Sequence, residues 1–549
     1  MQRIPGRRAA VAVGGSLALA LSQSPGMAIA LPGIPSVVAG SVAEARECAV
    51  PGVGPGLHSG IPTPSGYSPT RGTVSALTLF VDFPDAEAQI TTEARLAEFF
   101  PATSEYFAES SYGALDYRPA PVHGWLRMPQ PFEAYGIDRG VGWHPGDAQG
   151  YNRLMHDIVA ALERAAGDGG ADGEGRDGRP DGTPVRDTTA AGDGRADNPA
   201  PNSPTSVDHP APAGDRSDST GDTASTGDTG TTTDGADAPR SAGAAAPAPA
   251  GLNGRGVELD AADVDFSAHD LVNILTAPNA GPPAVEKVLS VSFPGRPLIP
   301  TDTGPLHNVS FIWSSQPGHT PHRVLVHENG HAFGLPDLYW TGEGPSPELT
   351  GHWDVMEQDW GPSNDILAWH KWKMGWLTDS EVDCVPGPGV TEHTVTPLGA
   401  PGAERAGGVD GVPRAAAGQG AGVAGTGVAA APGATGTDTR LVTVPLGPTE
   451  VLTLEVRVES GLDEAVCRPG VLIARVDTHR PSGEGPVRVV DATPGSDGCL
   501  TLPDPQVTPG LSDAPHRPGD VFHDEHAGVS VEVTDADADG RHTVRVTRR

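Results

Sequence analysis

The chain has 549 residues and carries 70 acidic against 36 basic side chains, which gives a formal net charge of −34. This length exceeds that of a typical single domain, so we expect two folded domains with additional segments. A protein so acidic repels the phosphates of nucleic acids and of anionic membranes, and neither is expected as a partner.

An export signal is predicted at the N-terminus, over residues 1–30. Three arginines within residues 3–8 precede an apolar run at 9–21, and the small residues at 28–30 suit a cleavage site. The apolar run is too short to span a bilayer comfortably, so no stable membrane insertion is expected after signal removal. We therefore expect a secreted, extracellular protein, with a retained lipid or helix anchor as the alternative.

The four cysteines suit an oxidising compartment, and they allow three sets of pairs. We favour a bond between Cys467 and Cys499, because both lie in one predicted β-rich domain. The second bond would then join Cys48 to Cys384. It would tie an irregular N-terminal arm at residues 31–70 to the end of the domain that follows.

The first folded part is predicted at residues 71–166. Alternating apolar residues over 77–83 are typical of a half-buried strand. A helix is predicted at 92–110. A second helix is predicted at 151–164, because large apolar residues recur there at every fourth position.

A disordered insertion is predicted at residues 167–252. Between residues 167 and 251 the chain contains no Phe, Trp, Tyr, Leu, Ile or Met. Such a segment cannot bury enough apolar surface to offset the entropy lost on ordering. We expect it to form a long surface loop within the first domain.

Order is expected to return near residue 257, where Asp260, Asp263 and Asp265 follow closely. Carboxylates are ligands that Ca²⁺ prefers, but acidic residues also favour the N-terminus of a helix. Ca²⁺ is therefore a second candidate ion, with helix capping as the alternative. Three further elements are predicted: a helix at 268–275 and strands at 285–293 and 309–315.

A helix with clear end signals is predicted after these strands. Thr320 can cap its start, and Pro321 suits the first helical position, where no N–H is needed. Gly334 tolerates the left-handed exit from a helix, and Pro336 cannot continue the hydrogen-bond ladder. The helix is therefore expected to end close to Gly334.

This helix carries residues that suit a metal centre. His327 and His331 are four positions apart, so both imidazoles project from one face and can hold one Zn²⁺. Glu328 follows the first histidine, where a carboxylate can take a proton from water on the metal. A third ligand is needed, and Asp337 is the first candidate because it follows the turn directly.

The motif H-E-N-G-H-A-F-G-L-P-D-L-Y over residues 327–339 resembles the immune inhibitor A-like family of secreted zinc metalloproteases, within the metzincin group. Metzincins usually end this motif with a third histidine, whereas this chain has Asp337, as that family and the snapalysin-like proteases do. The departure leaves Asp354, Glu357 and Asp359 as competing third ligands.

The resemblance extends over residues 71–166 and 253–377. It implies that Met356 lies in a tight turn beneath the metal, as a packing residue and not as a ligand. It also implies a closing helix at 365–377, whose tryptophans are expected in the core. The segment around Cys48 weakly resembles the propeptides in which a thiolate caps the zinc, so a zinc latch is the alternative to a disulfide.

The rest of the chain is predicted to form a linker and a β-sandwich. Residues 386–440 are rich in Gly and Ala and contain the linker. Residues 535–540 look like the start of a calcium loop but lack its closing Glu, so a hairpin turn is expected instead. Alternating strands are predicted at 452–458, 471–476, 487–490, 529–533 and 543–547.

These expectations describe an α+β protein, with a metzincin-like zinc protease domain interrupted by the insertion and a β-sandwich-like C-terminal domain. Its expected parts are the signal at 1–30, the arm at 31–70, the protease domain at 71–166 and 253–385, the insertion at 167–252, the linker at 386–440 and the β-rich domain at 441–549.

The expected function is that of a monomeric zinc endopeptidase that cuts protein or peptide substrates. His327, His331 and Asp337 would hold Zn²⁺, and Glu328 would act as the general base. A metal-dependent aminopeptidase and a non-catalytic surface or adhesion protein are the alternatives. The intact Glu328 argues against the second of these, since metal retention alone requires no base there.

Overall fold

A computed structural model of the chain places most of the residues of the predicted folded parts. It describes residues 45–54, 56–138, 142–169, 261, 264–280, 290–316, 320–342, 347–359, 365–399, 438–500 and 509–549. The predicted signal at 1–30, the predicted insertion from residue 170 onward and the Gly/Ala-rich stretch at 400–437 lie outside these residues. Contacts divide the chain into two units, and every described residue belongs to the unit made of Met1–Gly169 and Gly254–Arg549.

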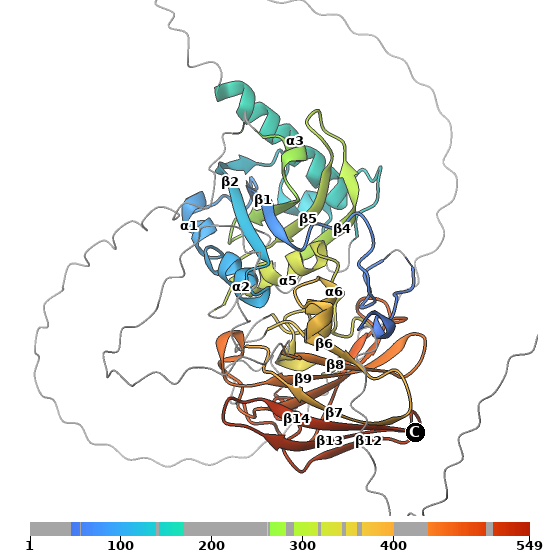
Figure 1. Ribbon diagram of the computed structural model, residues 1–549. Helices are drawn as coiled ribbons and strands as arrows, with labels where there is room; N and C mark the ends of the chain where they lie inside the picture. Colours follow the sequence, from blue (N-terminus) through green and yellow to red (C-terminus); the bar gives the residue numbers. More distant parts are fainter. Residues whose placement is uncertain are drawn as a thin grey trace, which may run out of the picture. The chain divides into compact units, whose positions relative to one another are not determined.

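The described residues form a mixed α/β structure of mostly sheets and few helices. The first sheet has five strands in the order β2-β1-β3-β5-β4 (Figure 1). Its first four strands run parallel, and β4 pairs antiparallel to β5 at one edge. The strands are β1 (Gly72–Asp82), β2 (Leu115–Arg127), β3 (Leu271–Thr276), β4 (Val291–Ile299) and β5 (Leu306–Ile312).

Apolar clusters cover both faces of this sheet. Successive side chains of a strand point to opposite sides, so one strand contributes to both clusters. In β1, Ala76 and Phe80 join one apolar cluster, whereas Leu77 and Leu79 join another. The predicted strand at 77–83 is therefore buried on both faces and not on one, as is usual for a parallel strand between two neighbours. The α-helices of the described residues are α1 (Thr92–Ala97), α2 (Ala102–Ser110), α3 (Gly150–Gly169), α5 (His322–Ala332) and α6 (Ala368–Lys373).

Two helix predictions differ from the structure. The helix expected at 92–110 is divided into α1 and α2, because Pro101 has no N–H to continue the ladder. The prediction of a helix at 268–275 is wrong. Those residues instead form a short 3₁₀ turn and the buried strand β3, since a short apolar run suits a central strand as well as a helix.

The remaining elements of the first part agree with the predictions in kind. The helix expected at 151–164 is α3, whose apolar side chains pack in the second cluster. The strand expected at 285–293 overlaps β4 at residues 291–293, while residues 285–289 lie outside the described residues. The strand expected at 309–315 corresponds to β5, which begins and ends three residues earlier. The expected closing helix contains α6, and its tryptophans are buried, as predicted: Trp369, Trp372 and Trp376.

The C-terminal part contains two further sheets that share one apolar cluster. One sheet has the order β11-β10-β9-β8-β6, and the other has the order β12-β13-β14-β7, of which β12, β13 and β14 are red in Figure 1. Their strands are β6 (Val382–Cys384), β7 (Gly389–Val395), β8 (Leu441–Pro445), β9 (Glu450–Arg457), β10 (Gly470–Asp477), β11 (Val487–Val490), β12 (Val521–Asp524), β13 (Val529–Ala536) and β14 (His542–Arg548).

Strand β7 lies inside the stretch predicted as a linker. Its sequence carries few large apolar residues, and Val395 alone among its side chains is fully buried, so its pattern provides little signal. It is held instead by pairing with β14 over its whole length. The turn predicted at 535–540 is confirmed, since β13 and β14 are joined there as a hairpin.

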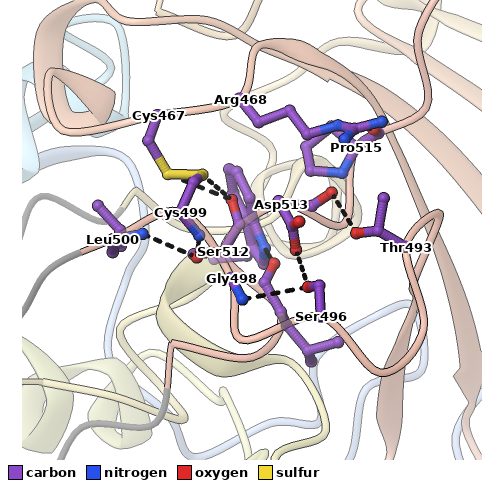
Figure 2. Close-up of a disulfide and its surroundings, with 12 residues drawn as sticks. Cys467, Arg468, Thr493, Ser496, Gly498, Cys499, Leu500, Ser512, Asp513 and Pro515 are labelled. Atoms are coloured by element: carbon purple, nitrogen blue, oxygen red, sulfur yellow. Dashed lines mark hydrogen bonds between the residues drawn. A yellow bond between two sulfur atoms is a disulfide. The ribbon is translucent and has the colours of Figure 1, made fainter.

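Both favoured disulfides are confirmed. Cys48 is bonded to Cys384, which excludes the zinc latch, and this bond ties the N-terminal arm to β6 of the C-terminal sheets. Cys467 is bonded to Cys499 (Figure 2). Ser512 lies against this second bond and accepts the backbone N–H of Cys499 at 2.8 Å. Among the described residues, no helix is both long and apolar enough to cross a membrane.

Candidate metal centre

Helix α5 is almost wholly buried, so tertiary packing and not surface amphipathicity holds it in place. It begins at His322 after Pro321, and no side chain caps it, so the predicted cap by Thr320 is wrong. Its end is as predicted. Gly334 adopts a φ of 90°, and the N–H of Leu335 returns to the carbonyl of Gly330 at 2.9 Å.

A closed polar network fixes the rotation of α5 on the first sheet. The amide of Asn329 donates to Asn273 on β3 at 2.9 Å and accepts the hydroxyl of Tyr117 on β2 at 2.6 Å. The amide of Asn273 in turn donates to the Tyr117 hydroxyl at 2.9 Å. Because all three groups are buried, their hydrogen bonds specify one orientation of the helix. This orientation turns the histidine face of α5 away from the sheet.

The two predicted histidines are oriented through their inner ring nitrogens. Nδ1 of His327 lies 2.9 Å from the carbonyl oxygen of Val355, and Nδ1 of His331 lies 2.8 Å from that of Leu335. A carbonyl can only accept, so Nδ1 carries the proton in each ring. Nε2 is therefore left to face the site, which is the arrangement that metal-binding imidazoles use.

The third predicted ligand meets both histidines. Oδ1 of Asp337 lies 3.3 Å from Nε2 of His327 and 3.2 Å from Nε2 of His331. A tetrahedral zinc site with donor atoms at about 2.0–2.1 Å spaces those atoms about 3.3–3.4 Å apart. The structure thus brings His327, His331 and Asp337 together at a spacing that fits this metal. In the described part of the chain, they form the one group of three such ligands.

None of the competing third ligands joins the three converging donor atoms. Asp354 is fully buried and accepts the N–H groups of Met356 at 2.9 Å and of Leu367 at 3.0 Å. Glu357 accepts backbone N–H groups from the segment before it. The charge of Asp359 helps to raise the pKa of His327, but this carboxylate is not among the three converging groups.

Met356 lies beneath the helix, as the resemblance implies. A Cβ placed on Gly330 would come within 2.5 Å of its sulfur, so helix and thioether are in tight contact. The buried carboxylate of Asp354 holds this turn and also accepts from Nδ1 of His370 at 3.2 Å. The turn that contains Met356 also places the carbonyl of Val355 against Nδ1 of His327.

Glu328 is buried beside the first predicted ligand, His327, and is held by the edge strand of the sheet. Oγ of Ser292 on β4 lies 2.9 Å from Oε2 of Glu328 and 2.7 Å from its backbone carbonyl. Sequence patterns provide no signal for Ser292, because β4 and α5 are brought together only by the fold. The bond engages one carboxylate oxygen and leaves Oε1 for another partner.

Charges within the centre are strongly coupled. Burial disfavours the charged forms of His327 and His331, but the surrounding carboxylates, Asp337 foremost, together outweigh it and raise the pKa of both imidazoles. Burial also opposes ionisation of Asp337, but the two histidines outweigh it and hold the pKa of this carboxyl well below its usual value. Burial raises the pKa of Glu328. A cation in place of the shared protons would satisfy all three ligands at once.

Of the predicted calcium site, the structure describes only Asp265. Asp260 and Asp263 lie outside the described residues. Asp265 accepts both the N–H and the hydroxyl of Ser267 and so acts as a cap for the 3₁₀ turn Phe266–Ala268. The helix-end interpretation therefore explains the one carboxylate of this cluster that is placed.

Comparison with known proteins adds no relative, since no protein-family model and no curated protein matches the chain.

Proposed function

We propose that this protein is a secreted zinc endopeptidase of the metzincin type, similar to the immune inhibitor A-like proteases. The observation that carries the proposal is the convergence of His327, His331 and Asp337 beside a buried Glu328. Two imidazoles and one carboxylate are a ligand set that leaves a position open on a catalytic zinc ion. A purely structural zinc site would have a closed set of four protein ligands.

His327, His331 and Asp337 would hold the ion. When bound, Zn²⁺ lowers the pKa of water to about 7 and polarises a carbonyl oxygen. The protein groups around it supply orientation, since the carbonyls of Val355 and Leu335 fix the two imidazole rings. Met356 supports the helix from below and excludes water from that side.

Glu328 is proposed as the general base. Its Oε2 is engaged by Ser292, so Oε1 is the oxygen that accepts a proton from the attacking water. The same carboxyl then delivers the proton to the amine that leaves when the peptide bond breaks. Burial raises the pKa of Glu328, which makes the protonated form easier to reach during this transfer.

The edge strand β4 is proposed to hold the substrate. It is an antiparallel edge of the five-stranded sheet, and it carries Ser292, which touches the base. An extended peptide can add to such an edge by main-chain hydrogen bonds. Binding of this kind needs no free N-terminus, which favours an endopeptidase over an aminopeptidase.

Secretion is part of the proposal. The two disulfides suit an oxidising compartment, where such bonds persist. The predicted signal at residues 1–30 would direct the chain there.

Cleavage assays on the purified full chain test the proposal. We expect the wild type to cut casein and a peptide with an acetylated N-terminus. Glu328→Gln keeps the shape and lacks the base, so it should lose nearly all activity, at least about 100-fold. Glu133→Gln, at an exposed position, is the matched control and should be fully active.

Each other outcome has a meaning. Cleavage of free N-termini alone would favour the aminopeptidase. A wild type that binds zinc and cuts no peptide would favour a binding role. An active Glu328→Gln would refute the assignment of the base.

A further inference from the structure

A loop of the C-terminal sheets reaches the candidate metal centre. Residues 478–486 connect β10 to β11, and Ser482 lies near the middle of this loop. Its hydroxyl donates to Oδ2 of Asp337 at 2.7 Å and accepts the backbone N–H of Asp337 at 2.8 Å. The two residues are 145 positions apart in the sequence.

The loop is held against the segment that follows α5. Gly483 donates its N–H to the carbonyl of Asp337 at 3.1 Å and accepts the N–H of Thr341 at 2.8 Å. Trp340 and Glu484 form an antiparallel bridge in the same place. Gly483 adopts a φ of 77°, and a Cβ there would come within 2.4 Å of Thr341, so only glycine fits this approach. Ser482 is thus delivered to Asp337 by a defined backbone pairing.

The two oxygens of Asp337 therefore have separate partners. Oδ1 faces Nε2 of both histidines, while Oδ2 is engaged by the Ser482 hydroxyl. An aspartate carboxylate can otherwise rotate about its Cβ–Cγ bond and present either oxygen. With Oδ2 bonded, Oδ1 alone is directed to the position that the imidazoles share.

We propose that Ser482 is a positioning residue for the third ligand, so that the C-terminal β-rich part completes the metal centre. This inference rests on the proposed function, because it assumes that Asp337 binds the ion. Groups that orient a ligand in this way typically account for about 10–100-fold in metal affinity. The β-rich part then has a role in the chemistry as well as in the fold.

The test is the zinc affinity of the full chain, measured by competition with a chromophoric chelator. Ser482→Ala should bind zinc about 10–100-fold more weakly than the wild type. Ser482→Thr keeps a hydroxyl and should stay close to the wild type. The matched control is Thr478→Val, which removes a hydroxyl from the same loop. That hydroxyl donates to the carbonyl of Pro51 at 2.7 Å and makes no contact with Asp337.

The outcomes separate the two proposals. A wild type without zinc overturns the proposed function, and this inference with it. If the wild type binds zinc and Ser482→Ala binds it equally well, the function stands and the positioning role is refuted. Equal losses in Ser482→Ala and Thr478→Val would mean that the loop acts only through stability. A loss in Ser482→Thr as large as in Ser482→Ala would remove the hydroxyl from the explanation.

Discussion

Replacement of Gly330 by alanine tests how tightly helix α5 packs against the side chain of Met356. In an open helix, a Gly→Ala change stabilises by about 1 kcal/mol, because alanine restricts the unfolded chain and suits the helix. Here the new methyl group would lie 2.5 Å from Sδ and 3.3 Å from Cε of Met356. Met356 is fully buried, so its side chain cannot move into solvent.

The gain in helix propensity and the cost of overpacking oppose each other, and their sizes decide whether the free energy of unfolding rises or falls. Overpacking of a buried site costs about 1–3 kcal/mol, which exceeds the helix gain in most of its range. We therefore expect Gly330→Ala to lower the free energy of unfolding, by up to about 2 kcal/mol. Urea unfolding of the full chain, followed by tryptophan fluorescence, measures this change.

A double-mutant cycle isolates the contact. Met356→Ala alone should cost about 2–5 kcal/mol, because it leaves a cavity. When Gly330→Ala is combined with it, the methyl group added at position 330 fills part of that cavity, so the two losses should not add. We expect a favourable coupling of about 0.5–3 kcal/mol. Zero coupling, or a Gly330→Ala protein more stable than the wild type, would refute this packing.

Two further predictions concern stability. Burial raises the pKa of Glu348 to about 7, so the stability it contributes is complete below its ordinary pKa of 4.5 and is lost as the pH rises through about 7. Glu348→Gln should therefore weaken the fall in Tm between about pH 5 and about pH 8, and an unchanged slope would contradict it. Cys48 and Cys384 are separated by 336 positions, and Cys467 and Cys499 by 32. The longer loop restricts the unfolded chain more. Replacing the first pair with alanine should therefore lower the free energy of unfolding by about 2 kcal/mol more than replacing the second, as measured by urea unfolding.

The residues of the candidate metal centre could be predicted because their signals are local. The spacing of His327 and His331 places them on one helix face, and Gly334 marks the turn that brings Asp337 back. The disulfides could also be assigned, since one pair lies within a single predicted domain. These features depend on residues near one another in the chain or on simple elimination.

The groups that hold the side chains of the candidate centre could not be predicted, because they come from distant segments. Ser292 reaches Glu328 from the edge strand, 36 positions away, and Ser482 reaches Asp337 from the C-terminal sheets. A single serine has no sequence pattern of its own. The strand β3 differs from the predicted helix for another reason, since its six residues are too few for their periodicity to distinguish the two.

The zinc content of the purified full chain tests the central claim most directly. We expect about one zinc ion per chain in the wild type and the same in Glu328→Gln, because the base is not a ligand. Metal analysis by mass spectrometry on protein secreted without added metal gives this number. A wild type that holds no zinc would contradict the account, whatever its other properties.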